Sequence, residues 1–324
     1  MLGFFKNIDL KKVLIIGDSM IDAYMWGNVH RMSPEAPVPV LDIHTKENRL
    51  GGAANVALNV KSLGATPILC TMIGADSDGL EFKRLMNEAG LSSEGLYIEE
   101  GRKTTIKTRI INDDKHLLRI DDEHIKDLDH RDSFLSLVRD ILLEHTIDVV
   151  IFEDYNKGLL TEEIITQSIE LFKGEGIPMI VDPKKKNFLA YKGVDIFKPN
   201  LKELKEGLNL DFDQKDPVAL SDAVRQLKTQ LNCKAVLLTL SEDGVFILND
   251  QGYYTEKAKK RNIIDVSGAG DTVVSVAAIS LSNDLSSKDL ARISNLAGGL
   301  VCEKVGVVPI DENELKAEVE KILL

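Results

Sequence analysis

Short apolar segments rich in β-branched residues alternate along the chain with amphipathic stretches. The apolar segments are VLIIGD at 13–18, PILCTMIG at 67–74, DVVIFED at 148–154, PMIVDP at 178–183, DIFKPN at 195–200 and AVLLTL at 235–240. Apolar residues recur with the helical period in the stretches 77–90, 130–145, 161–176 and 216–231. This alternation predicts an α/β fold in which helices cover both faces of a mostly parallel sheet.

Two regions follow a different pattern. Residues 36–50 and 103–120 alternate apolar and polar side chains with period two and lack a helical pattern. Such segments are typical of strands with one face in water. We expect them to form a small antiparallel sheet that projects from the main domain as a lid or a dimer surface. No repeat or linker divides the chain, so a single domain over 1–324 is expected.

Composition and charge narrow the class of protein. The 324 residues are 44% hydrophobic and 28% charged, as in an ordinary globular protein, with a formal net charge of -12. This charge argues against broad binding of nucleic acid or an anionic membrane, although local basic pockets can still bind small anions. The apolar runs 1–5 and 273–281 are too short for a secretory signal or a membrane span.

The cysteines give no sign of a metal or redox site. Cys70, Cys233 and Cys302 lie far apart in apolar stretches, without the paired spacing of zinc or redox motifs. We expect them to be reduced core thiols, and with the missing signal and membrane span this predicts a cytoplasmic protein. The six histidines show no metal-ligand spacing either.

The strongest local motif is DVSGAGDT at 265–272, followed by an apolar run. Gly268 and Gly270 permit tight turns, and the apolar run predicts a buried helix whose free N–H groups and positive dipole end point at the turn. An anion hole beside the Asp271 carboxylate suits transfer of a phosphoryl group to a hydroxyl. The alternative is a glycine turn capped by an acidic residue.

Two further motifs are suggestive when taken together. GGAANVALN at 51–59 opens a predicted helix, where small residues let a ligand approach and Asn55 can bond sugar hydroxyls; tight helix packing is the alternative. In NLKE at 200–203, Asn200 and Glu203 follow a strand and could hold hydrated magnesium and phosphate; an ordinary helix cap is the alternative.

Other familiar motifs are missing. The sequence has no P-loop and no GxGxxG after a strand. HRD at 130–132 imitates a protein-kinase loop, but Leu137 stands where the Asn is required and no DFG occurs, so we expect a solvated helix start. The acidic stretch 121–132 is expected to be a wet loop and helix cap.

With the Gly17-Asp18 strand end, the ordered motifs at 51–59, 200–203 and 265–272 resemble the ribokinase (PfkB) family of carbohydrate kinases over essentially the whole chain. Within that family, the segments 31–40, 153–158, 181–184 and 295–301 are most similar to kinases of D-glycero-β-D-manno-heptose 7-phosphate. The resemblance implies a ribokinase-like fold with a β lid. It also implies ATP- and Mg²⁺-dependent phosphorylation of the anomeric hydroxyl, giving the 1,7-bisphosphate for ADP-heptose and lipopolysaccharide core synthesis.

The resemblance also implies site residues. Asp271 would be the base, kept ionised by the helix dipole, beside the N–H groups of Gly268, Ala269 and Gly270. Residues of the nucleotide side would be Lys184, Asn200, Leu201, Lys202, Glu203, Thr239, Ser241, Gly244 and Asn295, with magnesium held through water by Asn200 and Glu203. Sugar hydroxyls would be held by Asp18, Asp22, Gly51, Gly52, Asn55, Asp154 and Lys157. The distal phosphate would be held by Arg31, Lys107, Arg109 and Arg119, whose alternative role is surface ion pairing.

Departures from the family pattern and rival functions complete the picture. Val266, Glu153 and Leu240 differ from the residues usual at those positions. The sequence contains no HxGH, so adenylylation of the product is expected elsewhere. We expect a homodimer formed through the lid. One rival function is a kinase of fructose 6-phosphate, ribose or a nucleoside; the segment SPEAPVPV and the basic lid residues argue against an uncharged acceptor. The other rival is a catalytically dead regulator that binds a sugar phosphate.

Overall fold

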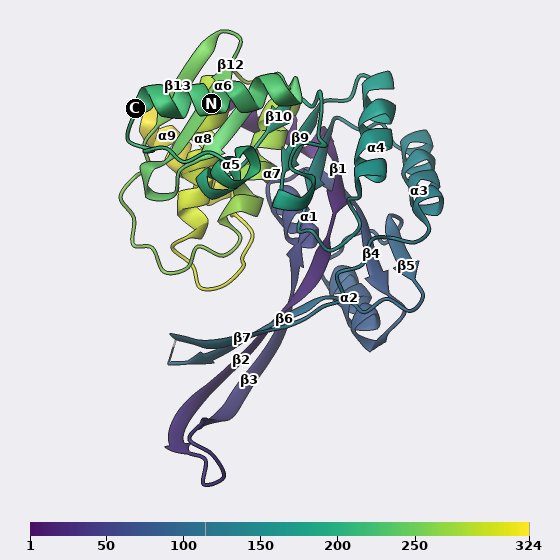
Figure 1. Cartoon of the computed structure of the whole chain (residues 1–324), viewed down its shortest axis with the longest axis vertical. Helices are drawn as coiled ribbons and strands as arrows, with labels where there is room; N and C mark the ends of the chain where they lie inside the picture. Colours follow the sequence, from purple (N-terminus) through teal and green to yellow (C-terminus); the bar gives the residue numbers. More distant parts are fainter. Residues whose placement is uncertain (114, 324) are drawn as a thin grey trace.

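The fold is built around a large, mostly parallel sheet. A computed structural model describes residues 1–113 and 115–323, and in these residues the main sheet has nine strands in the order β13-β12-β11-β10-β9-β8-β1-β4-β5 (Figure 1). They are β1 (Lys12–Gly17), β4 (Thr66–Gly74), β5 (Leu96–Glu99), β8 (Val149–Glu153), β9 (Met179–Asp182), β10 (Ile196–Phe197), β11 (Ala235–Thr239), β12 (Val245–Asn249) and β13 (Gly252–Glu256). Among the described residues, only the pairings β11·β12 and β12·β13 of this sheet are antiparallel, so the predicted α/β class is confirmed.

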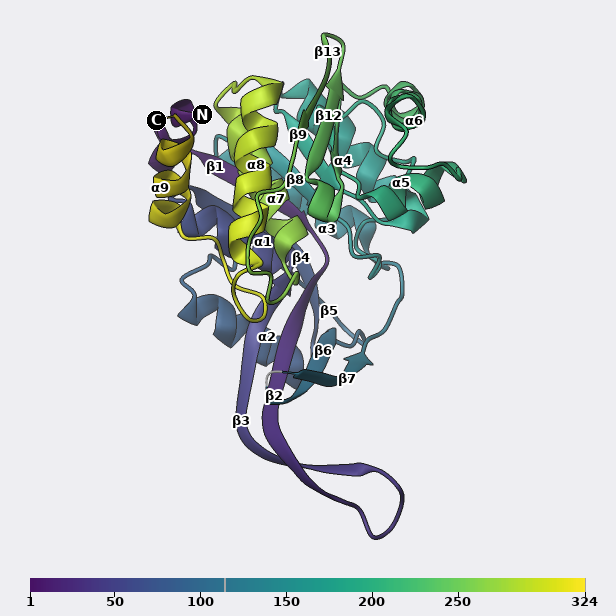
Figure 2. The ribbon, with the colours of Figure 1, turned by 90° about the vertical axis from the view of Figure 1, so that its left-hand side faces the viewer.

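Helices cover both faces of this sheet (Figure 2). They are α1 (Ala53–Ser62), α2 (Ser77–Glu88), α3 (Arg131–Glu144), α4 (Glu162–Gly174), α5 (Leu201–Leu208), α6 (Pro217–Leu231), α7 (Ala269–Ser282), α8 (Ser287–Val301) and α9 (Glu312–Leu323). Short 3₁₀ turns occur at Leu2–Phe5, Ile8–Leu10, Lys185–Asn187 and Ser241–Asp243. One apolar core joins the sheet to α1, α2, α7, α8 and α9, and a second joins it to α3, α4, α5 and α6.

Local chemistry explains where the predicted helices begin. The Thr161 hydroxyl accepts the Ile164 N–H at the start of α4, and Asp216 caps α6 with Pro217 in the first turn. The helix α3 begins after His130, as expected of a solvated helix start.

All three cysteines are free and buried, as predicted. Among the described residues, no helix is long and apolar enough to cross a membrane.

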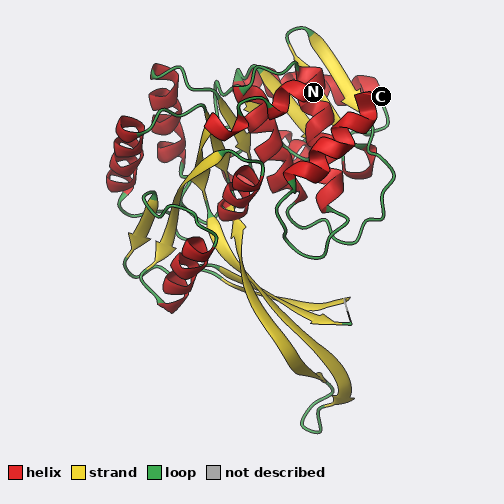
Figure 3. Cartoon of the chain, turned by 180° about the vertical axis from the view of Figure 1, so that it is seen from behind, coloured by secondary structure: helices red, strands yellow, loops and turns green. Residues whose placement is uncertain are grey.

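A second, smaller sheet projects from the body as a long twisted ribbon (Figures 1 and 3). This lid sheet has the order β3-β2-β6-β7 and consists of β2 (Ser19–Met32), β3 (Pro39–Gly52), β6 (Ile106–Asn112) and β7 (Lys115–Asp122). The predicted regions 36–50 and 103–120 lie in it, and β2·β3 and β6·β7 pair antiparallel as expected. The central pair β2·β6 is parallel.

The strand β2 was missing from the prediction. Its sequence SMIDAYMWGNVHRM has no clear alternation, because its first half is buried on both faces while its last residues are exposed. It continues almost directly from β1, so the lid sheet and the main sheet share one run of chain.

The strand register aligns charged side chains at one edge of the main sheet. Ile15, Ile151, Ile180 and Ile196 all belong to the core that contains α7. Two residues further along each strand, on the same face, stand Gly17, Glu153, Asp182 and Lys198. These positions lie at the carboxyl ends of the parallel strands, where open α/β sheets bind their ligands.

Candidate active site

The first residues of α7 form a turn with free N–H groups. Gly268 is the N-cap residue and has φ +79°, a left-handed conformation that favours glycine. The Ala269 N–H donates to the Val266 carbonyl, while the N–H groups of Gly268 and Gly270 find no acceptor in the described residues. Gly270 does not have a positive φ, so only Gly268 needs glycine for its conformation, whereas we expected both to do so.

Asp271 is buried in the first turn of α7 and held by two side chains. Its Oδ2 accepts the amide of Asn55 at 2.7 Å, and its Oδ1 accepts the hydroxyl of Tyr155 at 2.8 Å. Burial raises the pKa of Asp271, although both hydrogen bonds act to lower it. Burial therefore opposes the effect that we expected of the helix dipole on the charge of Asp271.

Below the α7 turn lies a buried ionic network. Lys198 Nζ binds Asp182 Oδ2 at 2.8 Å, and an ideal Cβ on Gly270 would lie 3.5 Å from that oxygen and 3.9 Å from Nζ. Glu153 is 1% exposed, and its Oε2 lacks a hydrogen-bond partner among the described residues. Burial, reinforced by Asp182 and Asp271, raises the pKa of Glu153 well above its usual value.

The NLKE motif joins this network to Lys184. Asn200 and Glu203 form a capping box at the start of α5: Asn200 Oδ1 accepts the Glu203 N–H, and Glu203 Oε2 accepts the Asn200 N–H, both at 2.9 Å. Glu203 Oε1 binds Lys184 Nζ at 2.8 Å. The Lys184 ammonium in turn lies 5.2 Å from the centre of the Tyr155 ring. Asn200 and Glu203 therefore do form a helix cap. The two oxygens used in the cap, Asn200 Oδ1 and Glu203 Oε2, each keep an unused lone pair.

The other residues expected on the nucleotide side contact neighbouring segments of the chain. Thr239 forms a parallel bridge with Asn200. Ser241 and Gly244 lie in the turn after β11 with φ +55° and +94°. Asn295 on α8 donates to the Lys257 carbonyl at 3.0 Å. Leu201 is half-buried, and the exposed Lys202 is within 3.8 Å of Glu206 only.

The small residues at the start of α1 make room for neighbouring chain segments. An ideal Cβ on Gly51 would lie 2.3 Å from Asp22 Oδ2, and one on Gly52 would lie 2.5 Å from the Asp18 carbonyl oxygen. Gly52 has φ +62°. Asn55 points at Asp271, which is a role that we had not assigned to it. Close packing therefore explains both glycines, and their contact with a sugar stays a prediction.

Three residues expected to contact sugar hydroxyls have other partners. The Asp18 carboxylate accepts the N–H groups of Tyr155, Lys157 and Leu159 at 2.9–3.1 Å. Asp154 accepts the Tyr191 hydroxyl and the Asn156 N–H, and burial and Asp18 raise its pKa to about 7. Asp18 and Asp154 therefore hold the loop 154–159. Lys157 Nζ binds Glu123 at 2.6 Å.

The basic lid residues do not form a single cluster. Arg109 is paired with Asp22, and Lys107 with Asp121 at 3.0 Å and Glu123 at 3.6 Å. Arg119 lies opposite Arg109 in the register but is 59% exposed, and it binds Asp121. Arg31 is exposed. It lies seven residues beyond Tyr24, which is paired with Arg109 in the strand register, and seven residues span roughly 23 Å of extended strand. Arg31 therefore lies far from Arg109 along the ribbon.

Several residues of this region were missed by sequence reasoning. Tyr155 directly follows one predicted strand, and Asp182 and Lys198 lie near the carboxyl ends of two others, so their position at strand ends was an available signal. Arg49 carried no signal. Its guanidinium lies 4.8 Å from the centre of the Tyr24 ring, and that of Arg109 lies 5.4 Å from the same centre.

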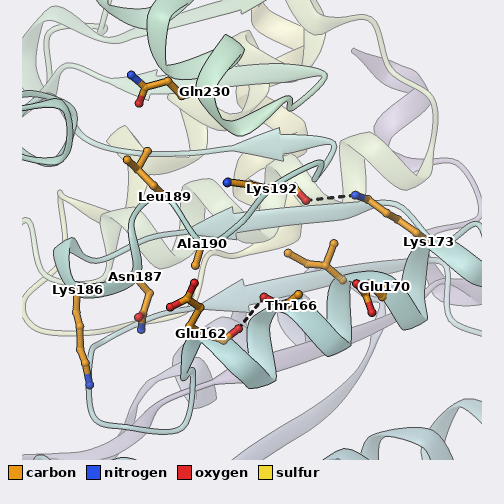
Figure 4. Close-up of a pocket in the computed structure, with 11 residues that line it drawn as sticks. Glu162, Thr166, Glu170, Lys173, Lys186, Asn187, Leu189, Ala190, Lys192 and Gln230 are labelled. Carbon is orange, nitrogen blue, oxygen red and sulfur yellow. Dashed lines mark hydrogen bonds between the residues drawn. The ribbon is translucent and has the colours of Figure 1, made fainter.

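Two surface features involve none of the predicted site residues. A hollow of about 820 Å³ is lined by α4, the segment 186–192 and Gln230, and contains none of the predicted residues (Figure 4). The acidic and histidine groups of Glu94, Glu144 and His145 approach one another on the surface near Lys12, at the amino end of β1.

Comparisons with known proteins agree with this geometry. Residues 10–313 match the model of the pfkB family carbohydrate kinases. The chain is 37% identical over 315 residues to a D-beta-D-heptose 7-phosphate kinase of Bordetella bronchiseptica, covering 97% of both chains. It is 36% identical to a bifunctional protein HldE of Desulfatibacillum aliphaticivorans over 95% of this chain, and spans 63% of that relative. Phosphofructokinase-2 of Escherichia coli, solved with substrates and products, superposes with a TM-score of 0.80 at 18% identity, covering 97% of this chain and all of that one.

The protein therefore belongs to the pfkB family of carbohydrate kinases. The solved neighbour is too distant in sequence to show more than the ribokinase-like fold.

Proposed function

We propose that this protein transfers the γ-phosphoryl group of ATP to the anomeric hydroxyl of D-glycero-β-D-manno-heptose 7-phosphate, giving the 1,7-bisphosphate and ADP. The observation that carries the proposal is the buried Asp271, held by Asn55 and Tyr155 beside the free N–H groups at the start of α7. The relative named as a heptose 7-phosphate kinase supports the choice of sugar. On this proposal the product serves ADP-heptose and lipopolysaccharide core synthesis.

In the proposed reaction, Asp271 accepts the proton of the anomeric hydroxyl as its oxygen bonds to the γ-phosphorus. The bond between that phosphorus and the β–γ bridging oxygen breaks, and the bridging oxygen leaves with ADP. The N–H groups of Gly268 and Gly270, at the positive end of α7, donate to the transferred phosphoryl oxygens. Lys198 lies close enough to Gly270 to add a positive charge.

Residues on the nucleotide side suit a hydrated magnesium ion. Asn200 and Glu203 keep oxygen lone pairs free outside their capping box, and hydrated Mg²⁺ prefers such oxygen ligands. When bound with ATP, the ion neutralises phosphate charge. Lys184 would exchange part of its contact with Glu203 for a phosphate oxygen. Thr239, Ser241, Gly244 and Asn295 remain candidates for the nucleoside part, whereas the exposed Lys202 does not.

The distal phosphate is assigned to the half of the lid sheet that lies nearest the body. Arg109 and Lys107 occupy alternate positions of β6 and so share a face with Asp22 and Tyr24. Both are largely buried and both are now paired with carboxylates. A substrate phosphate would compete for the same donors, which is a charge-assisted contact of the strong kind.

A screen of acceptors tests the proposed function. ADP release is coupled to a spectroscopic readout and measured with heptose 7-phosphate, free heptose, fructose 6-phosphate, ribose and adenosine. We expect the highest kcat/KM for heptose 7-phosphate. Faster turnover of fructose 6-phosphate would transfer the assignment to a rival kinase, and binding of sugar phosphates without ADP release would indicate a regulator.

A further inference from the structure

Tyr155 connects the proposed base to the proposed phosphate-binding lysine. Its hydroxyl donates to Asp271 Oδ1 at 2.8 Å, and its ring lies 5.2 Å from Lys184 Nζ. Its own backbone N–H donates to Asp18 Oδ2 at 3.1 Å, so the carboxylate at the end of β1 fixes the position of the tyrosine. One residue thus contacts both sides of the site, and nothing in the family resemblance assigned it a role.

The chemistry of this contact has a definite direction. Burial, together with Asp271, raises the pKa of Tyr155 well above its usual value, so the hydroxyl keeps its proton and acts as a donor. A donor on a carboxylate oxygen stabilises the ionised form, and for Asp271 it opposes the effect of burial. Without this bond, the carboxylate would keep only the amide of Asn55 and could rotate about it.

Other charged groups surround Asp271 from the neighbouring elements. Acidic groups come from β2, β8 and β9, and positive ones from the segments that follow β9 and β10; they are Asp22, Glu153, Asp182, Lys184 and Lys198. The charges of Asp182 and Asp22 disfavour a further negative charge on Asp271. The hydroxyl of Tyr155 therefore matters more here than it would beside an isolated carboxylate.

We infer that Tyr155 is a positioning residue, which orients Asp271 toward the sugar hydroxyl, favours its ionised form, and supports Lys184 through the face of its ring. This inference rests on the proposed function, because it assigns a partner to the proposed base. The hydroxyl and the ring act separately: the hydroxyl on the base, and the ring on the ammonium through a cation–π contact.

The test compares Tyr155→Phe with Tyr155→Leu, because Phe removes only the hydroxyl and Leu removes the ring as well. For Tyr155→Phe we expect kcat to fall roughly 10- to 100-fold, as for a small misplacement of a reacting group, with KM for ATP and sugar nearly unchanged. The acid limb of its kcat–pH profile should move to higher pH, because the carboxylate loses a donor. Tyr155→Leu should in addition raise KM for ATP. Tyr97→Phe, on the edge strand β5, is the matched control and should behave as wild type.

Two results would overturn the inference: a Tyr155→Phe variant with wild-type kcat, or a lower kcat with an unmoved acid limb, since a merely structural role would not alter the ionisation of the base. Asp271→Asn, measured in parallel, distinguishes failure of this inference about Tyr155 from failure of the proposed function. An active Asp271→Asn enzyme removes the base itself, whereas an inactive one beside a normal Tyr155→Phe removes only the role of Tyr155.

Discussion

Asn55 and Asp271 stand 216 positions apart in the sequence and are joined by a 2.7 Å hydrogen bond between two buried side chains. The bond links the first turns of α1 and α7, so the two glycine-rich motifs form one site. The bond uses the amide nitrogen of the Asn55 side chain. The side-chain oxygen Oδ1 of Asn55 receives a weak 3.5 Å contact from the amide of Asn59. A sugar hydroxyl that enters the site would meet a carboxylate already in a fixed orientation.

Asp271→Asn tests the base. The amide keeps the shape of the side chain but cannot accept a proton at the position required, and loss of a general base typically costs about 10²–10⁴-fold in rate. We expect a folded protein that binds ATP, measured by calorimetry, and has almost no ADP release. The exposed Asp211→Asn is the control. A rate above about a tenth of wild type would exclude Asp271 from this role.

Gly268→Ala tests the turn at the start of α7. A side chain at φ +79° carries a left-handed strain of about 1–2 kcal/mol, and its Cβ would lie 3.1 Å from the Asn55 amide nitrogen. Both kcat and the melting temperature should fall. Gly174→Ala, where an ideal Cβ has no neighbour within 4 Å, should leave both unchanged. Unaltered turnover in Gly268→Ala would show that the turn does not contact the transferred group.

Arg109→Gln tests the distal phosphate. Glutamine can still bond Asp22 but carries no charge, and one charged hydrogen bond of about 1.5–3 kcal/mol corresponds to about 10- to 150-fold. The preference for heptose 7-phosphate over free heptose, measured as a ratio of kcat/KM, should shrink by that factor. The free sugar should be affected little. An unchanged ratio would remove Arg109 from the phosphate pocket, and Arg139→Gln on α3 is the control.

Glu153→Gln tests the buried acid through stability. The folded-state pKa of Glu153 lies well above the ordinary value of 4.5, so above pH 4.5 the unfolded chain releases this proton while the folded chain retains it. Wild-type stability therefore falls as pH rises through the interval between the two pKa values. Glutamine removes this cost.

Thermal unfolding should accordingly show a higher melting temperature for Glu153→Gln than for wild type at pH 8, by about 2–4 °C per kcal/mol removed, and little difference near pH 4. The exposed Glu175→Gln should show no such dependence on pH. A difference of equal size at both pH values would contradict the assignment of a neutral, buried Glu153.

Ile120→Lys tests assembly through the lid sheet. Leu118 and Ile120 share one face of β7 and are 56% and 48% exposed, which is unusual for large apolar side chains on a strand. We expect wild type to sediment as a dimer, at twice 35.9 kDa, and Ile120→Lys as a monomer. Leu143 on α3 is 85% exposed and lies outside the lid sheet, so Leu143→Lys is the control and should remain a dimer. A wild-type monomer at micromolar concentration would refute the proposal.

Much of the fold follows from local pattern. The parallel strands are continuous β-branched runs, and the helices at 161–176 and 216–231 have caps that can be read directly from Thr161, Asp216 and Pro217. The strand β2 was not predicted, because its burial changes from two faces to none along its length, and no periodicity marks such a strand.

The site was predictable in type but less so in detail. The motifs identify which segments meet, yet Asp18, Asp154 and Asn55 turn out to hold a loop or the base, because backbone N–H groups and buried donors compete for their oxygens. Single-sequence reasoning cannot see which donors arrive from distant segments. The same holds for Tyr155, whose hydroxyl reaches Asp271 across 116 positions of sequence.

The place of α7 in the core also determines the order in which the molecule can be completed. Ile15, Ile151 and Ile180 belong to strands that precede α7 by about 90 residues or more, yet they pack in the core that α7 completes. During synthesis at the ribosome, that face of the sheet lacks α7 until residues 269–282 have been made. Asp271 reaches Asn55 only when α7 docks, so the nascent chain becomes competent for the proposed chemistry at that point.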